Sequence, residues 1–564
     1  MGFLLHKKMQ AAIQELLTNL VEDVDVEQLK KDISRKYKLE RWPSNIEILN
    51  ELSADERKQY AKYLITKPSR TLSGVIPIAV MAAPFGCPHG KCIFCCGGPG
   101  SVFGDVPQSY TGNEPSTMRA IRAHYDPYLI VFNRLEQYVV IGRIPQKCDV
   151  IIQGGTFPSM PKDYQYEFVT SIFKALNDFS ALFLKDGELD FAAFKTFFEL
   201  PGDVHNDARA ELVRKKILAL KGKLVLEEEQ KRNETASMRC IGLTIETKPD
   251  WGFVEHGNEL LQLGCTRIEI GIQSTFQDVI EKLNRGHTVE ETIRSMRELK
   301  DLGFKMNAHM MLGLPGSTPE KDLASLQELF DNPDFRPDMI KIYPCLVMKG
   351  TPLFELWKQG KYKEMSAETA ADIIAEAKRF IPPYVRIMRV QRDIPSTVID
   401  AGPIRTNLRQ EVEKICQKRN IKCRCIRCRE SGRNGTIEKI TLTVREYDAS
   451  RGKEFFIALE DTKNDILVGY CRLRFPGQSL RAEITEKTAI VRELHVYSDA
   501  LQLGERSEKS LQHRGFGKQL MEKAEAIAKE HGKEKVVVIS GVGVRGYYYK
   551  LGFTRDGPYM GKKL

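Results

Sequence analysis

The sequence VIPIAVMAAPFGCPHGKCIFCCGGP, residues 75–99, decides the interpretation of the whole chain. The apolar run that opens it predicts a strand, and the loop that follows carries Cys87, Cys92, Cys95 and Cys96. Thiolates this close together favour a soft metal centre, either an iron–sulfur cluster or zinc. The first three, spaced C-x4-C-x2-C, would leave one iron of a four-iron cluster open to a chelating cofactor. A zinc knuckle, which would use all four thiolates, is the alternative that the spacing leaves open.

Length and composition set the outer limits. At 564 residues the chain is long enough for more than one domain. It contains 85 Lys and Arg against 75 Asp and Glu, and this net charge of +10 suggests a polyanionic partner. No apolar run approaches the ~20 residues of a membrane span, so no membrane segment is expected. Thirteen cysteines, an odd number in clusters, indicate metal ligands and buried thiols in a reducing cytoplasm rather than disulfides.

Strand-like and helical segments alternate within residues 67–381, which predicts parallel βα units. The expected strands cover residues 76–81, 150–153, 240–246, 267–273, 304–311 and 339–343. Six such units make a partial TIM-like (βα)6 barrel, an α/β fold with its chemistry at the C-terminal strand ends. A charged, helically periodic segment at about residues 179–236 interrupts the alternation, and we expect it to be an insertion packed outside the barrel.

Residues 434–564 are expected to form a second α/β module. Several strand-like runs precede QHRGFGKQLMEKAEAIAKEHG, which predicts an amphipathic helix. Gly515 and Gly517 at its start would expose backbone N–H groups, and the helix N-terminus adds positive potential. This combination suits a pyrophosphate, although an ordinary loop fits the spacing as well.

The most basic stretch is residues 382–433, where Lys and Arg outnumber the acids. A local surplus of this kind predicts contact with a nucleic-acid backbone, and a solvated charged surface is the alternative. The candidate contacts are Arg386, Arg389, Arg392, Arg424 and Arg427.

Four cysteines of the same stretch predict a structural zinc ion in the linker between the two modules. Cys423, Cys425 and Cys428 lie together in CRCIRC, and Cys416 lies one or two helical turns earlier. Buried free thiols are the alternative, and a residue from elsewhere, Cys345 included, could replace one ligand.

Residues 1–66 are expected to be a basic, helical segment that binds RNA. The sequence LKKDISRKYKLERWP places Tyr37 and Trp42 among basic residues, a mixture that suits contacts with RNA backbone and bases. A solvated helical surface explains this composition equally well.

Motifs along nearly all of the chain beyond residue 67 resemble one enzyme family. They are CPHGKCIFC, QSYTGNEPSTMRAIRAHYDP, GLTIETKPD, EIGIQST, NRGHT, HMMLGLPGST, ELHVY, QHRGFG and GVGVRGYY. In these the chain resembles the radical S-adenosylmethionine enzymes, and specifically the Elongator catalytic subunit family in its archaeal and bacterial single-chain form. That family joins a radical S-adenosylmethionine barrel to a Gcn5-related (GNAT) acetyltransferase domain. The resemblance implies that Cys87, Cys92 and Cys95 hold a [4Fe–4S] cluster. Cys96 stands where the family usually has Pro, and no role is assigned to it.

The resemblance also implies two cofactor sites. The residues expected at S-adenosylmethionine are Gly154, Gly155, Thr156, Glu246 and Gln273. Lys248 replaces an Arg that is more usual in the family's ETRPD, so planar bidentate recognition is in doubt there. The residues expected at acetyl-CoA are Leu494, Val496, Gln512, His513, Gly515, Phe516, Gly517 and Lys518. Tyr547 and Tyr548 match the paired catalytic tyrosines of the family. Core packing is the alternative for these two, and it is our expectation for Tyr549.

Taken together, the resemblance implies a tRNA wobble-uridine carboxymethyl transferase. A radical derived from S-adenosylmethionine would activate the acetyl methyl group of acetyl-CoA, which would then add to carbon five of the uridine. The expected partners are a tRNA anticodon stem-loop, whose base can be splayed into a pocket, and an external electron donor. The short cysteine spacing is similar to that of the single-chain forms, so no obligatory partner subunit is expected and a homodimer is left open.

Two other functions stay open at this stage. One is a protein lysine acetyltransferase with a structural cluster, and the other is a non-catalytic RNA-binding scaffold. For the carboxymethyl transferase we also expect residues 476–489, PGQSLRAEITEKTA, to form a gate beside the acetyl-CoA site.

Overall fold

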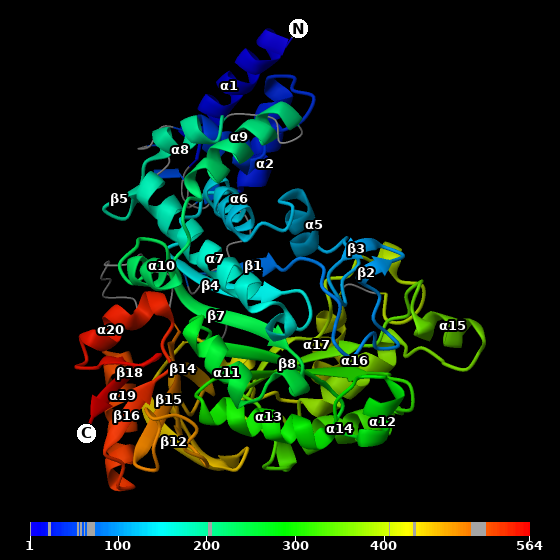
Figure 1. Ribbon diagram of the computed structural model, residues 1–564. Helices are drawn as coiled ribbons and strands as arrows, with labels where there is room; N and C mark the ends of the chain where they lie inside the picture. Colours follow the sequence, from blue (N-terminus) through cyan, green and yellow to red (C-terminus); the bar gives the residue numbers. More distant parts are fainter. Residues whose placement is uncertain are drawn as a thin grey trace.

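The computed structural model describes residues 2–20, 24–52, 56, 59–60, 63–64, 74–200, 206–404, 407–431, 436–497 and 515–564. Over these ranges the centre of the molecule is a seven-stranded sheet in which neighbouring strands are parallel (Figure 1). In spatial order the strands are β1 (Val75–Met81), β4 (Lys147–Gln153), β7 (Arg239–Thr247), β8 (Arg267–Gln273), β9 (Lys305–Leu312), β10 (Met339–Pro344) and β11 (Arg386–Arg389). This is the α/β half-barrel that the alternation of the sequence predicts.

The strand that the hydrophobic pattern does not reveal is β11. Its sequence, RIMR, is short and half basic, so it lacks the apolar alternation by which strands are identified. It pairs with β10, where Ile387 lies opposite Ile340. Part of the segment expected to be a linker is therefore the edge strand of the first sheet.

Helices between successive strands cover this sheet, and their first turns explain where they begin. Asp126 caps two backbone N–H groups at the start of α6, and Pro127 takes the first helical position, where no donor is needed. Thr288 and Glu291 form a capping box at the start of α13. The main crossover helices are α6 (Pro127–Val140), α7 (Lys162–Phe183), α11 (Val254–Gln262), α13 (Val289–Asp301), α14 (Pro319–Asp331) and α16 (Ala367–Ala377). None of the helices in the described residues combines the length and apolar composition that a membrane crossing requires.

The interruption after α7 is a group of short elements that packs on α6 and α7. Because α7 continues to Phe183, the interruption begins a few residues later than the sequence suggests. Its elements are β5 (Leu184–Lys185), β6 (Glu188–Leu189), α8 (Phe191–Phe197), α9 (Asp207–Leu220) and α10 (Leu226–Asn233). The N-terminal helices lie beside α9, at the end of the molecule far from the second sheet (Figure 1). They are α1 (Gly2–Thr18), α2 (Val26–Lys36) and α3 (Asn45–Glu51), and they share a small apolar core.

The C-terminal part of the described chain forms a second, mixed seven-stranded sheet. In spatial order its strands are β12 (Thr441–Ala449), β13 (Gly452–Asp461), β14 (Ile466–Phe475), β15 (Thr488–Val496), β16 (Lys535–Val538), β18 (Tyr559–Lys563) and β17 (Thr554–Asp556). The pair β15–β16 is parallel and the other neighbours are antiparallel. Pairing of β15 with β16 ends at Val491 and Val538, so the two strands separate before Leu494. The helices are α19 (Phe516–Glu530) and α20 (Arg545–Tyr549).

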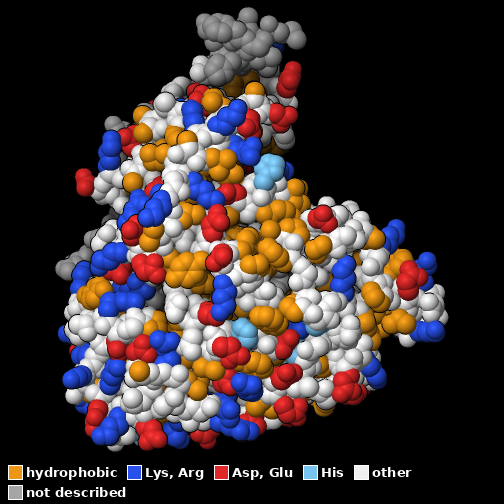
Figure 2. Space-filling view, in the orientation of Figure 1, with side chains coloured by type: hydrophobic (Ala, Val, Ile, Leu, Met, Phe, Trp, Pro, Cys, Tyr) orange, Lys and Arg blue, Asp and Glu red, His pale blue; other side chains and the backbone are white. Residues whose placement is uncertain are grey.

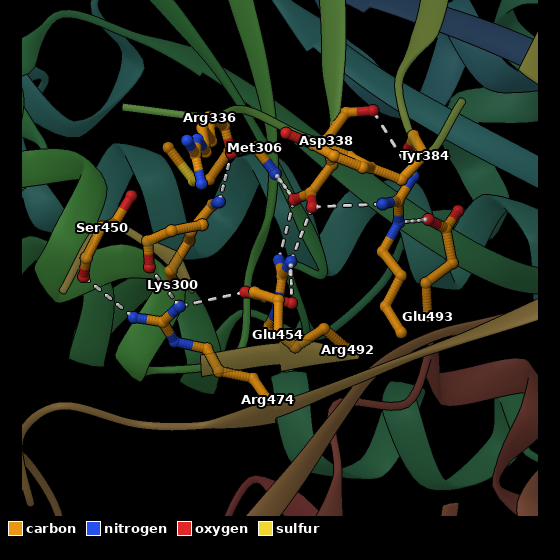
Figure 3. Close-up of polar contacts among 12 residues, drawn as sticks. Lys300, Met306, Arg336, Asp338, Tyr384, Ser450, Glu454, Arg474, Arg492 and Glu493 are labelled. Carbon is orange, nitrogen blue, oxygen red and sulfur yellow. Dashed lines mark hydrogen bonds and ion pairs between the residues drawn. The ribbon is translucent and has the colours of Figure 1, made fainter. Parts of the chain in front are cut away.

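Buried charges join the two sheets (Figure 3). Arg474 on β14 bonds Asp301, the last residue of α13, and Arg492 on β15 bonds Asp338, the residue before β10. Both arginines also pair with Glu454 on β13. All five side chains are fully or almost fully buried, so each charge depends on its partners for compensation. The two sheets are therefore held in one relative position.

The expectation that residues 476–489 gate the acetyl-CoA site is wrong. This loop leads into the first residue of β15, whereas Leu494 and Val496 lie at the far end of that strand. The loop is also tied to the first domain, because Gly477 N–H donates to Asp301 and Arg481 donates to Asn258 at 2.6 Å. The sequence shows that the loop is next to the second module, but it does not show at which end of the sheet the loop lies. The direction of β15 decides that.

Candidate functional site

The C-terminal ends of the parallel strands surround a pocket with about 1110 Å³ of empty space, part of it open to solvent. Side chains two residues apart on a strand share a face, so Glu269 and Gln273 of β8 point into it together, as do Lys341 and Tyr343 of β10. The polar or ligating residues of its lining include Cys87, Cys92, Cys95, Gln108, Tyr110, Gly155, Thr156, Glu246, Lys248, Glu269, Gln273, Arg285, His309, Lys341, Tyr343, Arg389 and Arg392. This is the position at which the barrel pattern predicts chemistry.

The structure separates the fourth cysteine of the loop from the first three. Cys87, Cys92 and Cys95 line the pocket. Cys96 packs instead with Leu346 and other apolar side chains, and burial raises the pKa of its thiol to about 12. All thirteen cysteines carry free thiols.

The spacing of these sulfur atoms fits a cluster better than a single ion. Zinc–sulfur bonds of about 2.3 Å hold the sulfurs of a tetrahedral site about 3.8 Å apart. Among the described residues, the one group of three metal-ligating side chains within 4.8 Å of one another is a different one. The thiols of the pocket are therefore more widely spaced than a single zinc ion requires, and a zinc knuckle of all four does not fit.

Each pocket thiol has a polar neighbour. Cys92 Sγ receives Arg285 Nη1–H at 3.4 Å and lies 3.3 Å from His89 Nε2. Cys95 Sγ lies 3.0 Å from Gln108 Oε1, and Cys87 Sγ lies 3.7 Å from a threonine hydroxyl. Arg285 and the threonine hydroxyl can donate hydrogen bonds to thiolate ligands, as such groups do around iron–sulfur clusters, so this part of the site fits one. Gln108 Oε1 only accepts, and here it accepts from the neutral Cys95 thiol.

The residues expected at S-adenosylmethionine come together on the β4, β7 and β8 ends of the pocket. Gly154 and Gly155 have φ angles of 127° and 100°, which strongly favour glycine. Gly155 and the following Thr156 line the pocket, whereas Gly154 packs on Ala82 at the end of β1. Gln273 has a φ of 72°, and its buried Oε1 has no hydrogen-bond partner among the residues that the structure describes, so it is available for a ligand.

Glu246 is buried in the same pocket and titrates near neutrality. Burial raises the pKa of its carboxyl group to about 7, with a further contribution from the charge of Glu269. Tyr110 donates its hydroxyl hydrogen to Glu246 at 3.2 Å. A carboxylate in this position can accept hydrogen bonds from hydroxyl or amino groups of a ligand.

Several pocket residues were not identified from the sequence. Glu269, His309 and Lys341 come from three successive strands and form one polar group, in which His309 lies 2.9 Å from Glu269 and Lys341 pairs with Glu269. Burial and the charge of Lys341 lower the pKa of His309 to about 4, so the neutral ring donates to Glu269. The available signal was a polar residue between apolar neighbours in each strand: Glu269 in RIEIGIQ, His309 in KMNAHMML and Lys341 in MIKIYP. Arg285 was missed because its approach depends on Gly271, where a Cβ would lie 2.3 Å from its guanidinium.

The residues expected at acetyl-CoA are brought together in part. Gly515, with a φ of 79°, precedes the first residue of α19, and Leu494 lies next to Gly517. A Cβ at Gly517 would come within 2.6 Å of the Tyr547 hydroxyl, so this glycine allows the tyrosine to reach the helix start. Phe516 and Lys518 share the first turn of α19, and Val496 ends β15. Gln512 and His513 lie outside the described residues.

The three tyrosines of α20 have different environments. Tyr547 is 36% exposed, and burial of its hydroxyl raises its pKa to about 12. Tyr548 is buried in the core of the second domain against Phe553. Tyr549, which we expected in the core, is 39% exposed, so that expectation is wrong. Tyr548, one residue earlier, occupies the core instead. Successive side chains of a helix point about 100° apart, so neighbouring residues face different surroundings.

A second cysteine group lies at the start of α18 (Ile426–Arg429). The sulfurs of Cys423, Cys425 and Cys428 all lie within 4.8 Å of one another, close enough to share one tetrahedral ion. Cys416, on α17 (Leu408–Lys418), is outside this group. Cys345 packs in a separate core with Cys92 and Cys95, so it is no substitute ligand here.

The five candidate arginines face different surroundings. Arg386 bonds Glu430 at 2.7 Å and the Tyr497 hydroxyl at 2.9 Å, so it points into the protein. Arg392 lines the pocket and donates to the Ser109 carbonyl, and Arg389 lies at the pocket, paired with Asp393. Arg424 is 53% exposed on its side chain and Arg427 is half-buried. Positive and negative side chains are mixed over the face shown in Figure 2.

Comparison with known proteins covers almost the whole chain. Residues 7–72 match the ELP3 N-terminal domain, residues 83–329 the radical SAM superfamily, residues 337–418 its C-terminal domain, and residues 424–553 the acetyltransferase (GNAT) family. A tRNA uridine(34) acetyltransferase of Methanocaldococcus jannaschii is 45% identical, with 96% of this chain and 94% of that protein aligned. Elongator complex protein 3 of Saccharomyces cerevisiae is 40% identical, over 97% of this chain and 94% of that protein.

A solved structure agrees with these sequence matches. The archaeal Methanocaldococcus infernus Elp3 with an N-terminal deletion superposes with a TM-score of 0.70 at 39% identity, covering 88% of this chain and 100% of that one. The chain therefore belongs to the Elp3 family, in which a radical SAM domain and a GNAT acetyltransferase domain share one polypeptide.

Proposed function

We propose that this chain modifies uridine 34 of tRNA by carboxymethylation at carbon five, with S-adenosylmethionine and acetyl-CoA as reactants. The observation that carries this proposal is the pocket at the strand ends, where three cysteine thiols meet Gly155, Thr156, Glu246 and Gln273. Its relatives named tRNA uridine(34) acetyltransferase align over nearly the full length of the chain, which supports uridine 34 as the target.

In this proposal Cys87, Cys92 and Cys95 hold a [4Fe–4S] cluster. When bound, the cluster supplies the electron for reductive cleavage of S-adenosylmethionine. Glu246 accepts hydrogen bonds from the ligand in its ionised form, and Gln273 offers its unpartnered Oε1. Glu246 and Gln273 lie on neighbouring strands of one sheet, so their positions are fixed before the ligand binds. They can therefore orient the ligand without a conformational change.

The second domain holds acetyl-CoA at the start of α19. Gly515 and Gly517 leave backbone N–H groups open toward a pyrophosphate, and the helix N-terminus favours its negative charge. Tyr547 lies beside Gly517 and keeps its proton at neutral pH, so its hydroxyl is placed to donate to the departing CoA thiolate. Tyr548 supports it from the domain core.

The uridine reaches the pocket past Arg389 and Arg392. Arg389 is exposed at the pocket and can meet a phosphate, while Arg392 lies deeper, against the cysteine loop. Arg424 and Arg427, on the surface around α18, and the basic N-terminal helices extend the contact along the tRNA. The exposed Trp42, with Lys31 over its ring, offers a stacking surface.

One reconstitution tests the function. The purified chain, reconstituted with iron and sulfide, is incubated anaerobically with reductant, S-adenosylmethionine, acetyl-CoA labelled in its acetyl carbons, and unmodified tRNA. Digestion and mass spectrometry should find the labelled carboxymethyl group on uridine 34 and nowhere else. Omission of S-adenosylmethionine should abolish it. Acetylation of a lysine peptide that proceeds without S-adenosylmethionine and outpaces tRNA labelling would contradict the proposal and support a protein acetyltransferase.

The tyrosine assignment has its own test. Acetyl-CoA hydrolysis by the chain should be slow alone and rise several-fold with tRNA, since early hydrolysis wastes the reactive carbon. Tyr547→Phe should reduce the stimulated rate and leave tRNA affinity unchanged. Tyr549→Phe, on an exposed neighbour, is the matched control and should match the parent chain.

We further propose that Cys423, Cys425 and Cys428 hold a structural zinc ion. Their sulfur spacing supports this, as does the position of α18, which contacts β11 of the first sheet and β14 of the second. The ion would fix α18 against β11, where Ile426 N–H already bonds the Val385 carbonyl at 2.9 Å.

A further inference from the structure

Lys248 is not one of the residues predicted to hold the cluster or S-adenosylmethionine, but its side chain contacts the cysteine loop. Its ammonium lies 3.1 Å from His89 Nδ1 and 3.1 Å from Asp250 Oδ2. Only 3% of the Lys248 side chain is exposed to solvent. Among the described residues, His89 and Asp250 therefore take the place of water as hydrogen-bond partners of the ammonium group. The other ring nitrogen, His89 Nε2, lies 3.3 Å from Cys92 Sγ. Asp250, Lys248, His89 and Cys92 therefore form one chain of polar contacts that ends on a cluster ligand.

The chemistry of the chain determines where its protons lie. An ammonium group only donates hydrogen bonds, so His89 Nδ1 must accept from Lys248. A neutral imidazole that accepts at Nδ1 carries its proton on Nε2, which faces the sulfur. The lysine thus orients the His89 ring and selects the tautomer that donates to Cys92.

The neighbouring loop holds this geometry in place. Gly286 has a φ of 69°, and a Cβ there would lie 2.6 Å from His89 Cβ, so the loop presses directly on the histidine. The same loop receives Ile93 N–H at the Leu283 carbonyl. Arg285 adds the second donor to Cys92 Sγ.

We propose that Lys248 is a positioning residue that raises the reduction potential of the cluster by fixing the hydrogen bond from His89 to Cys92. Hydrogen bonds to ligand sulfur stabilise the more negatively charged, reduced cluster and so make it easier to reduce. The inference rests on the proposed cluster at Cys87, Cys92 and Cys95. It assigns Lys248 a role in electron acceptance rather than in contact with a ligand.

A redox titration followed by electron paramagnetic resonance tests the proposal in the full chain, first without and then with S-adenosylmethionine. The variants are Lys248→Met, Lys248→Arg and His89→Phe. Lys91→Met is the matched control, because Lys91 is an exposed cation adjacent to Cys92. Iron content per chain is measured first, so that loss of the cluster is distinguished from a change in its potential.

At a fixed applied potential, Lys248→Met and His89→Phe should each lower the ratio of reduced to oxidised cluster about tenfold, or ~59 mV for one electron. Lys248→Arg should stay within about threefold of the parent chain, since arginine is also a donor without acceptor capacity. Lys91→Met should change the ratio less than twofold, because water screens an exposed charge. The double variant of Lys248 and His89 should equal either single one, because the lysine acts through the histidine.

Three results would overturn the inference. They are a Lys248→Met shift no larger than that of Lys91→Met, additive shifts in the double variant, and a shift that occurs only when S-adenosylmethionine is present. The last result would make Lys248 a cofactor ligand. A parent chain that binds no iron would instead refute the proposed cluster site, and the two failures are thereby distinguished.

Discussion

Asp338 and Arg492 form a buried ion pair with two hydrogen bonds, of 2.7 and 2.6 Å, across the two domains (Figure 3). Asp338 precedes β10, which carries Lys341 into the pocket, and Arg492 lies on β15, two residues before Leu494. The pair therefore connects the strand of one site to the strand of the other. Removal of water from both charges is costly, so their geometry must be kept for the pair to be tolerated.

Asp338→Asn should strongly destabilise the chain. It removes the negative charge and leaves Arg492 short of a partner in the interior, which costs about 3–5 kcal/mol of unfolding free energy. Urea unfolding measures this. Asp334→Asn is the control, because Asp334 pairs with Arg451 at the surface and should contribute less than about 1 kcal/mol. Equal losses in the two variants would contradict a structural role for the buried pair.

Cys92→Ala and Cys95→Ala should each abolish iron loading, because a methyl group cannot ligate iron. Cys96→Ala should keep the full iron content, since that thiol lies in a separate apolar core. Iron and sulfide analysis after anaerobic reconstitution measures the cluster content of each variant. Loss of iron in the Cys96 variant would restore the fourth thiol as a ligand.

Binding of S-adenosylmethionine should weaken as the pH falls through about 7. The raised pKa of Glu246 means that the carboxyl group is protonated below this value and accepts fewer hydrogen bonds. About a tenth of it is ionised one pH unit lower, so affinity at pH 6 should be roughly tenfold below that at pH 8. Calorimetry over this range measures the dependence. Glu246→Gln should bind weakly at every pH, and a slope that persists in this variant would assign the titration to another group.

Salt dependence should separate the arginines that face outward from the one that faces inward. Arg389→Gln with Arg424→Gln should weaken tRNA binding and flatten the plot of affinity against salt, because each lost phosphate contact releases fewer counterions. Arg386→Gln should leave this slope unchanged, since the Arg386 side chain is only 18% exposed and bonds Glu430 and Tyr497. Arg389 and Arg424 also pair with carboxylates, but about half of each side chain is open to solvent. The opposite pattern would place the RNA on the Arg386 side.

Zinc content should depend on three cysteines and not on the fourth. Cys425→Ser should lose the metal and lower the melting temperature, because the ion contributes folding free energy. Cys416→Ser should retain it, since Cys416 lies outside the close group. Metal analysis of the purified chains measures both. Retention of zinc by the Cys425 variant would favour free thiols.

The sequence alone determined the six strands whose apolar runs stand out, the second α/β module and the cysteine loop. These follow from local patterns, in which a few adjacent residues carry the whole signal. The edge strand β11 lacked such a pattern and was missed. The expectations for Tyr549 and for residues 476–489 depended on the direction of a side chain and of a strand, which local patterns leave undetermined.

Only the tertiary structure decided which side chains share a site. Glu269, His309 and Lys341 are far apart in sequence and meet because three parallel strands align their inward positions. The path of the cysteine loop separates Cys96 from Cys95, although the two are adjacent along the chain. The pairing of β11 turns Arg386 inward and leaves Arg389 exposed. The sequence determines how many charged side chains a segment carries. Strand pairing and burial determine whether each of them contacts a ligand, another charged group or water.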